Sequence, residues 1–309
     1  MNFEFTISVI IPCQNHTDEL RRCLAALKGQ QPFIDHEIIV VDSTPDDERL
    51  SKIRAAFPHV RHVKGHKPLL AGEARNLGVK FARGRYLAFI DADCLPEHDW
   101  LHVVRKVLDK GYLFVGGPVL DCLPYHPIAA ADNLLQLPDF TSYRPSGIAS
   151  HLPGGNMATN RAAFHAIGGF SAGIAVGEDT LLSSAAAKRW PRKVYFSNAM
   201  RVCHYGRERM KDFLFHQRQF GYFRAVFGLH VSALYLRLGK SIVFSCLFAL
   251  RRIGYFVFRA LQWRPISLLW IIVHLPFLLL GLTAWAIGFW KGCRARKNQA
   301  RMQSKESIV

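Results

Sequence analysis

The chain has 309 residues, of which 50% are hydrophobic, and it carries 40 Lys and Arg residues against 23 Asp and Glu residues. This length allows one large domain or two modest ones with a sizeable core, and the apolar content excludes a disordered or low-complexity protein. The sequence has no Gly-X-Y, heptad or longer repeat, which excludes fibres and solenoids.

The positive charge is concentrated in the last third of the chain. Residues 1–200 hold 22 Lys and Arg against 20 Asp and Glu, a net charge of +2, whereas residues 201–309 hold 18 against three, a net charge of +15. Long apolar runs separate these charges, a pattern that favours an anionic membrane surface over nucleic acid. We therefore expect membrane lipids and no nucleic acid among the partners, with a polyanion-binding protein as the alternative.

The cysteines and the N-terminus bear on the compartment. The seven cysteines are scattered and form no CxxC pair, which argues against a disulfide framework and a zinc knuckle and fits a reducing compartment. The N-terminus has no basic segment followed by a hydrophobic core and a cleavage site, as a secretory signal peptide would have. We expect the front half to be cytoplasmic.

In the front part, short apolar strands alternate with amphipathic helices. Strands are predicted at 7–11, 37–41, 60–63, 86–90, 113–115 and 193–196, and helices at 17–27, 50–57, 72–82, 101–108, 161–167 and 180–188. This alternation predicts an α/β fold with a mostly parallel sheet flanked by helices, ending near residue 205. Ligands collect at the carboxyl ends of such strands, where Asp42, Asp91 and Asp93 fall. The proline-rich stretch 121–153 is expected to face the substrate rather than the core.

The sequence of the C-terminal third predicts a helical membrane region. Residues 206–260 predict amphipathic, interfacial helices, because aromatic residues alternate with Arg and Lys; the alternative is a helix packed on the domain with a solvated face. Arg251 and Arg252 disfavour a full crossing at 241–258. Residues 261–309 predict a hydrophobic membrane helix or a re-entrant hairpin broken at Pro276, followed by a basic cytoplasmic tail.

One acidic pair stands at the end of a predicted strand. Asp91 and Asp93 follow the apolar run 86–90 and are separated by a single alanine. Carboxylate oxygens are the ligands that Mg²⁺ and Mn²⁺ prefer, so the pair predicts a site for a divalent cation and a diphosphate. Such pairs also occur in ordinary turns, and the pair alone does not decide.

Further motifs accompany this pair in a fixed order. They are Ser8-Val9-Ile10-Ile11-Pro12-Cys13-Gln14-Asn15, Val40-Val41-Asp42-Ser43, Ala74-Arg75-Asn76-Leu77-Gly78, Asp91-Ala92-Asp93, Gly154-Gly155-Asn156, Gly168-Gly169-Phe170 and Gly177-Glu178-Asp179. As an ordered set over about residues 5–205 they resemble the family 2 glycosyltransferases, which have the GT-A fold. Ser43 departs from the pattern, since that family often has a second acidic residue there.

The resemblance implies roles on the donor side. Asp42 would accept hydrogen bonds from the base of a nucleotide-sugar, which we expect to be uridine, while Pro12 and Asn15 would shape the floor of the pocket. Arg75 would lie near the diphosphate and Asp91 near the ribose or a metal-bound water, in keeping with the affinity of guanidinium groups for phosphate. The alternatives are a plain turn residue for Asn15 and a surface arginine for Arg75.

The metal ligands follow from the same resemblance. Asp93 would bind a divalent cation, Mg²⁺ or Mn²⁺, and His204 occupies the place of a histidine that many GT-A enzymes add as a ligand. A lone histidine is often structural, which is the alternative for His204. The cation would neutralise the departing diphosphate.

The catalytic residues implied are Glu178 and Asp179. One of them would be the general base that takes the proton of the acceptor hydroxyl, and the family pattern points to Asp179. The alternative is an acidic cap at a helix N-terminus. Gly154, Gly155 and Asn156 would lie on the acceptor and sugar side, where glycine lets the backbone approach closely.

These inferences predict a membrane-attached, inverting, metal-dependent glycosyltransferase. Processive synthases of this family carry a Gln-x-x-Arg-Trp motif, but Ala186 stands where the glutamine would precede Arg189 and Trp190, so we expect transfer of a single sugar. A lipid-linked acceptor at the cytoplasmic face of the cell membrane, in glycan or polysaccharide biosynthesis, fits the apolar C-terminal third. The alternatives are a nucleotidyltransferase, which would need a glycine-rich loop after the first strand, and a nucleotide-binding pseudoenzyme that scaffolds a membrane complex.

Overall fold

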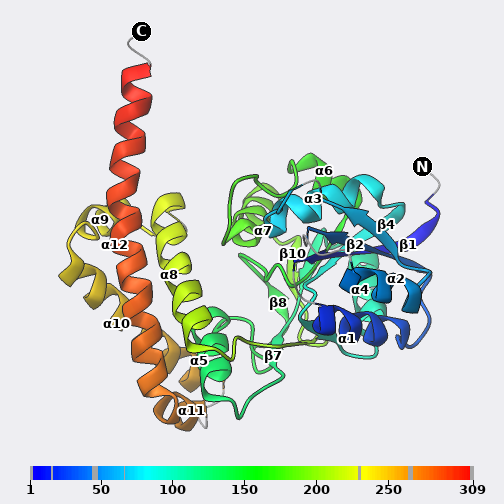
Figure 1. The fold of residues 1–309 in the computed structure, drawn as a ribbon, viewed down its shortest axis with the longest axis horizontal. Coiled ribbons are helices and arrows are strands. Elements are labelled where there is room, and N and C mark those ends of the chain that lie inside the picture. The colour runs from blue at the N-terminus through cyan, green and yellow to red at the C-terminus, as the bar shows by residue number, and fades with distance from the viewer. Residues whose placement is uncertain are drawn as a thin grey trace. The chain divides into compact units, whose positions relative to one another are not determined.

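A computed structural model describes residues 3–14, 17–43, 48–65, 67–228, 231–263 and 267–306 (Figure 1). The chain folds into two compact units. The first, here the N-terminal unit, comprises Met1–Cys122 and Phe140–Tyr205, and the second, the helical unit, comprises Leu123–Asp139 and Gly206–Val309.

The N-terminal unit is built on an eight-stranded sheet. Its strands are β1 (Phe5–Cys13), β2 (His36–Asp42), β3 (Arg61–Lys64), β4 (Gly84–Ile90), β6 (Phe114–Gly116), β8 (Gly147–Ile148), β9 (Asn156–Asn160) and β10 (Val194–Phe196), in the order β3-β2-β1-β4-β9-β6-β10-β8. The first four run parallel, as do β6 and β10, whereas β9 is antiparallel to both β4 and β6. The predicted mostly parallel α/β sheet is confirmed.

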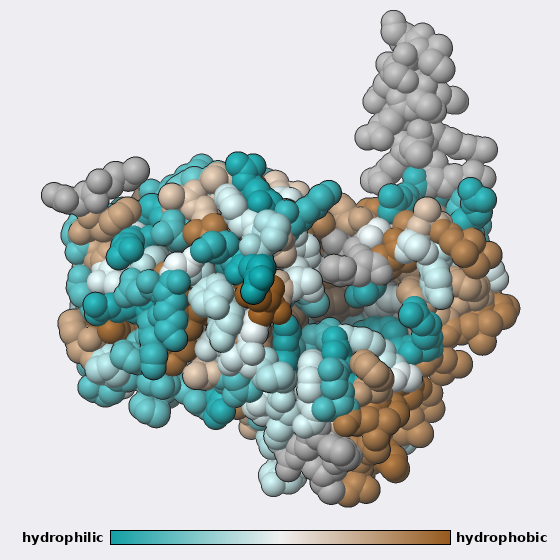
Figure 2. All heavy atoms as spheres, turned by 180° about the vertical axis from the view of Figure 1, so that it is seen from behind, coloured by the Kyte–Doolittle hydropathy of each residue, from teal (hydrophilic) through white to brown (hydrophobic). Residues whose placement is uncertain are grey.

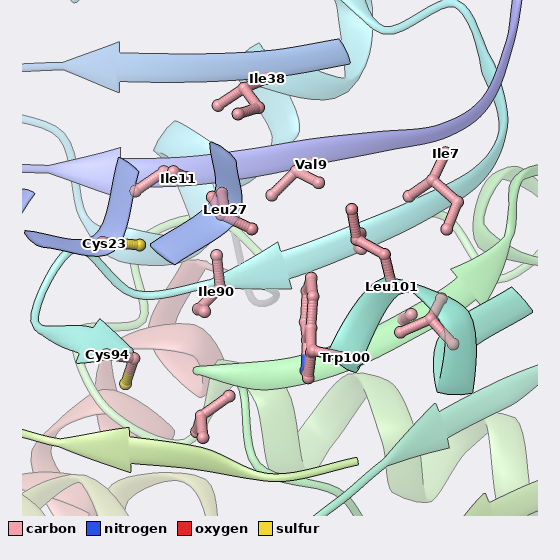
Figure 3. Close-up of a cluster of buried hydrophobic side chains, with 14 of the residues drawn as sticks. Ile7, Val9, Ile11, Cys23, Leu27, Ile38, Ile90, Cys94, Trp100 and Leu101 are labelled. Atoms are coloured by element: carbon pink, nitrogen blue, oxygen red, sulfur yellow. The ribbon is translucent and has the colours of Figure 1, made fainter. Parts of the chain in front are cut away.

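Helices cover both faces of this sheet. α1 (Thr17–Lys28), α2 (Glu48–Ala56) and α4 (Trp100–Asp109) share a core with the odd-numbered residues of β1, where Val9 and Ile11 lie among Leu27 and Trp100 (Figure 3). α3 (Ala71–Phe81) packs on the other face, where a Cβ on Gly78 would lie 2.6 Å from Ile10. β1 is apolar on both faces because both are covered.

A three-stranded sheet of β5 (Cys94–Pro96), β11 (Val202–His204) and β7 (Val119–Asp121) was not predicted. β11 lies in its centre and places His204 opposite Cys94 on one side and Asp121 on the other. Cys122 and Cys203 form a disulfide beside it, and the other five cysteines are free. One pair is not a disulfide framework, but the scattered spacing gave no sign that Cys122, directly after β7, meets Cys203 of β11.

The proline-rich stretch 121–153 differs from its prediction, because it contains a buried helix. α5 (Pro127–Gln136) belongs to the helical unit and buries Ala129, Ala130, Ala131 and Leu135. Pro127 starts this helix rather than breaking it, since the first helical position needs no backbone N–H donor. The apolar stripe of α5 is core, not a substrate-facing surface.

The helical unit contains α5, α8 (Met210–Phe227), α9 (Ala233–Leu238), α10 (Ile242–Trp263), α11 (Ser267–Val273) and α12 (Leu275–Glu306). Its core includes Phe213, Trp285 and Phe289. α8 and α12 approach closely at two glycines: a Cβ on Gly221 would lie 2.0 Å from the carbonyl oxygen of Trp285, and one on Gly288 would clash in the same way with Arg218. Small residues permit such close helix packing.

The uncharged run at 266–290 is interrupted at His274, between α11 and α12, and Pro276 lies in the first turn of α12, where proline is tolerated. Among the described residues, one helix is long and apolar enough to cross a membrane, Leu275–Arg296, with a mean hydropathy of 1.3. Hydrophobic side chains also gather on the surface of the helical unit, at the right of Figure 2. They include Val243, Leu247, Phe258, Leu261, Leu269, Ile272 and Val273.

Candidate active site

A buried arginine joins two acidic motifs. Arg75 of α3 donates through Nη2 to Oδ1 of Asp91 at 2.5 Å and through Nη1 to Oε1 of Glu178 at 2.7 Å. Its side chain is 2% exposed, and its guanidinium lies over the ring of Phe170 at 5.3 Å. Asp91 follows β4, and Glu178 is the first residue of α7 (Glu178–Arg189). The guanidinium therefore fastens the carboxyl end of β4 to the N-terminus of α7.

The charges of this group are strongly coupled. Burial alone would lower the pKa of Arg75, but the carboxylates of Asp91 and Glu178 outweigh it and raise that pKa. Burial, followed by the neighbouring Asp179, raises the pKa of Glu178 to about 7, although Arg75 acts in the opposite direction. Arg75 is thus a permanent cation, whereas Glu178 is a buried acid that titrates near neutral pH.

Asp179 is held by backbone amides. The N–H of Gly154 donates to its Oδ2 at 2.7 Å, and the N–H of Thr180 donates to its Oδ1 at 2.6 Å. The two glycines before β9 permit this packing: a Cβ on Gly154 would lie 2.9 Å from the Cβ of Asp179, and one on Gly155 would lie 2.7 Å from Oδ2 of Asp91. At Gly154 and Gly155 the backbone therefore lies close to the carboxylates of Asp179 and Asp91.

The assignment of Asn156 to the sugar side is corrected by its surroundings. Its side chain is completely buried and donates through Nδ2 to the carbonyl oxygens of Pro118 and Met200, at 2.9 and 2.7 Å. Its Oδ1 accepts from the indole N–H of Trp100 at 2.8 Å. The side chain of Asn156 therefore connects β9 to α4 and to the loops before β7 and β11 through hydrogen bonds. A buried amide group needs such hydrogen-bond partners within the protein.

Asp93 and His204 lie together. The Nε2 of His204 is 3.5 Å from Oδ2 of Asp93, and both side chains are partly exposed, at 12% and 21%. The N–H of Tyr205 donates to the carbonyl oxygen of Asp93 at 2.9 Å, which holds β11 against this turn. A carboxylate and an imidazole at this spacing suit a divalent cation that takes its other ligands from substrate oxygens. No group of three such ligands is found within the described ranges.

The expected nucleotide side lies at the ends of β1 and β2. Asp42 is 1% exposed, and its Oδ2 pairs with Nζ of Lys64 at 3.3 Å. Pro12 is half-buried in β1 opposite Val41. Asn15 lies outside the described residues. Lys64, which sequence reasoning missed, follows only from the parallel register of β2 with β3.

A second missed contact fixes the Gly-Gly-Phe turn. Asn76, next to Arg75 on α3, donates to the carbonyl oxygen of Phe170 at 2.7 Å and accepts from its N–H at 3.0 Å. Gly169 has a φ of +72°, which favours glycine at this turn. Arg75 and Asn76 are neighbours in one sequence motif, which was the available sign that Asn76 also has a role at the site. Arg75 binds Glu178, and Asn76 binds the backbone of Phe170.

Comparisons with known proteins identify the family of the chain. A family model described as glycosyl transferase family 2 matches residues 8–168, which is 161 of the 309 residues. Among curated relatives, glycosyltransferase AglE of Haloferax volcanii is 32% identical over 118 residues, 37% of this chain and 39% of the relative. The pre-mycofactocin glycosyltransferase of Mycobacterium tuberculosis is 23% identical over 221 residues, 70% of this chain and 46% of the relative. The matches thus span less than half of these relatives.

Solved structures share the fold at low identity. The mannosyltransferase PcManGT of Pyrobaculum calidifontis, solved in complex with GDP-Man and Mn²⁺, aligns with a TM-score of 0.60 and 16% identity over 94% of this chain and 90% of that one. TarS of S. aureus aligns with a TM-score of 0.50 and 18% identity over 72% of this chain and 40% of that one.

Proposed function

Because the chain belongs to the family 2 glycosyltransferases, we propose that it transfers one sugar from a nucleotide-sugar to an acceptor hydroxyl with inversion at the anomeric carbon. The observation that carries the proposal is the bridge of Arg75 between Asp91 and Glu178. It gathers the acidic motif after β4, the Gly-Gly segment before β9 and the start of α7 into one group.

The donor side is assigned to Asp42 and its surroundings. A buried carboxylate at the end of β2 can accept from the imide N–H of a base, and we propose a UDP-sugar on that ground. Nζ of the neighbouring Lys64, 3.3 Å away, holds Oδ2 of Asp42 in place. GDP-mannose, which PcManGT binds, is the donor to test against it.

Asp93 and His204 are the proposed ligands of a divalent cation, Mg²⁺ or Mn²⁺. Their donor atoms and partial exposure fit such an ion. When bound, the cation supplies neutralising charge for the diphosphate leaving group. The chain's own part is to keep these two side chains adjacent, through the strand pairing of β5 with β11.

Asp179 is proposed as the general base and Glu178 as a positioning residue. Glu178 is buried and its carboxylate is bound to Arg75, so it is not placed to receive a proton from an acceptor. Asp179 takes the proton of the acceptor hydroxyl while that oxygen bonds to the anomeric carbon. The bond from this carbon to the phosphate oxygen breaks, and its electron pair leaves with the nucleoside diphosphate.

The helical unit supports a location at the cytoplasmic face of the cell membrane. It exposes apolar side chains along α10 and α11, and it contains the candidate span Leu275–Arg296. The net charge of +15 in residues 201–309 suits anionic lipids. A lipid-linked acceptor is the substrate class that we propose from this location.

A donor panel tests the function. The full chain in detergent is incubated with UDP-sugars and GDP-mannose, Mn²⁺ and a membrane lipid extract, and release of nucleoside diphosphate is measured. We expect release with a UDP-sugar, its loss on chelation, and recovery when Mn²⁺ or Mg²⁺ is restored. Donor binding with no turnover on any acceptor would instead indicate a scaffold protein.

A further inference from the structure

The helix α10 is apolar on the side that it exposes as well as on the side that it buries. Its buried residues recur at helical spacing and are Ser245, Ala249, Phe256 and Ala260. On the opposite side a second row, here called the apolar face, has the same spacing and is 47–65% exposed: Val243, Leu247, Leu250, Phe258 and Leu261. A helix in contact with water on one side usually carries polar residues there, so the apolar face indicates contact with something other than water.

The short helix α11 adds to this exposed apolar surface. Ile271 is buried in the core of the helical unit together with Phe256 and Ala260 of α10, whereas Ile272 and Val273 are 64% and 69% exposed. Hydrophobic side chains gather along this side of the unit, at the right of Figure 2. Exposed apolar surface that gathers on one side marks a site of contact with another molecule or with a membrane.

The charge beside the apolar face favours one partner. Exposed cations lie next to it, since Arg237 and Lys240 precede α10 and Arg251 lies on this helix. The chain has no Asp or Glu between Asp212 and Glu306. A second copy of the chain would bring the same positive charge and would be repelled, whereas an anionic lipid surface attracts cations that flank an apolar face.

The inner side of α10 is tied to α5 and to the loop that follows α5 by polar groups. Nη2 of Arg252 donates to the carbonyl oxygen of Leu135 at 2.6 Å, and Nη2 of Arg259 pairs with Oδ1 of Asp139 at 2.8 Å. If α10 crossed a bilayer, these charged groups would enter the hydrocarbon with it, where charged side chains are strongly unfavourable. The contacts therefore favour a helix that lies in the membrane surface.

α12 contains the candidate span Leu275–Arg296, but it is packed into the core of the helical unit. Its residues that are at most 2% exposed are Leu278, Leu282, Trp285, Ala286, Phe289 and Cys293. α8 lies directly against it, because Gly288 leaves no room for a Cβ beside the carbonyl group of Arg218. α8 exposes Lys211, Asp212 and Arg218. A crossing by α12 would either draw these charges into the bilayer or break the glycine contacts.

We propose that the helical unit is monotopic: the apolar face of α10 and the exposed side of α11 enter one leaflet of an anionic membrane, and neither α10 nor α12 crosses it. Arg251, exposed beside Leu247 and Leu250, then extends to the lipid phosphates, as long cationic side chains do at an interface. Both ends of α12 stay on one side of the bilayer. The inference rests on the proposed membrane location but on no step of the transfer reaction.

A native cysteine reports the depth of α10. Cys246 is exposed next to Leu247, whereas the other four free cysteines are buried, so a thiol-reactive fluorophore selects it in the folded protein. The labelled full chain is reconstituted into phosphatidylcholine–phosphatidylglycerol vesicles that carry a spin-label quencher either near the headgroup or deep in the acyl chain. We expect stronger quenching by the shallow label, as for a helix at the boundary of headgroups and acyl chains. No quenching, or stronger quenching by the deep label, would overturn the proposal.

Sidedness tests the course of α12. In a Cys246→Ser background, single cysteines are introduced by Arg294→Cys in α12 and by Lys106→Cys in the N-terminal unit, both at exposed positions. A membrane-impermeant maleimide should label both variants in inside-out membrane vesicles and neither in intact spheroplasts. Labelling of the two variants in opposite preparations would show a crossing and refute the inference. A chain that stays in the soluble fraction would refute it together with the membrane location, but not the glycosyl transfer.

Two exposed phenylalanines locate the membrane contact. Phe258 on α10 and Phe215 on α8 are 58% and 62% exposed, and Phe215 lies between Asp212 and Arg218 on its helix. Phe258→Gln should weaken partitioning into vesicles that contain phosphatidylglycerol by about tenfold, because the membrane contact loses a large apolar side chain. Phe215→Gln is the matched control and should stay within about twofold of wild type. Equal effects of the two substitutions, or a larger effect of Phe215→Gln, would contradict the assignment of the apolar face.

Discussion

Nη1 of Arg75 lies 2.7 Å from Oε1 of Glu178, although 103 residues separate the two in the chain. The same guanidinium holds Asp91 through its other terminal nitrogen. Since this cation is buried and bound to both carboxylates, the arrangement of the two acidic motifs depends on one side chain.

Removal of that side chain should destabilise the N-terminal unit. Arg75→Met leaves Asp91 and Glu178 without their shared cation, and breaking a buried ion pair costs about 3–5 kcal/mol. Urea unfolding followed by tryptophan fluorescence measures the change. Arg75→Lys, which keeps the charge but offers a single donor group, should lose less; equal losses would show that packing, not charge, holds the site.

Glu178 predicts a pH dependence of stability. Its pKa of about 7 in the folded protein lies above its usual value of 4.5. A raised pKa in an acid means that the folded state binds more protons, so the free energy of unfolding falls as pH rises from about 4.5 to 7, by roughly 3 kcal/mol. Glu178→Gln cannot titrate and should flatten this part of the profile. If the free energy of unfolding of Glu178→Gln still fell between pH 4.5 and 7, another group would be responsible for the pH dependence.

Gly154 should tolerate no side chain. Alanine there places a Cβ 2.9 Å from Asp179 and 3.2 Å from Nη1 of Arg75. The resulting shift should lower kcat by about 10–100-fold, because small displacements of catalytic groups are costly. Gly147→Ala is the control, since a Cβ at Gly147 meets no atom within 4 Å. Similar rates in the two variants would contradict the packing described for Asp179.

Asn156 should matter for stability rather than for sugar recognition. Asn156→Leu strands two carbonyl oxygens and the Trp100 indole N–H, which together cost about 3 kcal/mol or more. In the fraction that remains folded, KM for donor and acceptor should stay near wild type. A rise in KM without loss of stability would restore the sugar-side assignment.

The sheet could be predicted because its signals are local. β1, β2 and β4 are largely apolar runs that end at Cys13, Asp42 and Ile90, and their parallel pairing follows from the helices between them. β11 could not be predicted, since three residues next to a loop have no periodicity. Its position is set by partners on either side, about 80 to 110 residues earlier in the chain.

The site was predictable as a set of residues but not as a network. The order of motifs indicated Asp91, Asp93, Arg75, Glu178 and Asp179, while the sharing of one guanidinium between two motifs is a tertiary contact. Asn156 was assigned to the acceptor and sugar side because it follows Gly154 and Gly155 in a motif of the family resemblance, in which glycine would let the backbone approach the sugar. In the structure Gly154 and Gly155 let the backbone lie close to Asp179 and Asp91. The side chain of Asn156 is buried.

The central claim is that Asp179 takes the acceptor proton while the residues around Arg75 only position it. Asp179→Asn keeps the shape of the side chain and an oxygen for the Gly154 N–H, but an amide cannot act as the base. Transfer and donor binding are measured side by side on this variant, by release of nucleoside diphosphate and by calorimetric titration of the donor. The account predicts a loss of transfer of 100-fold or more, as a rough value for a general base, with the donor Kd within about threefold of wild type. Near-normal transfer by Asp179→Asn would contradict it.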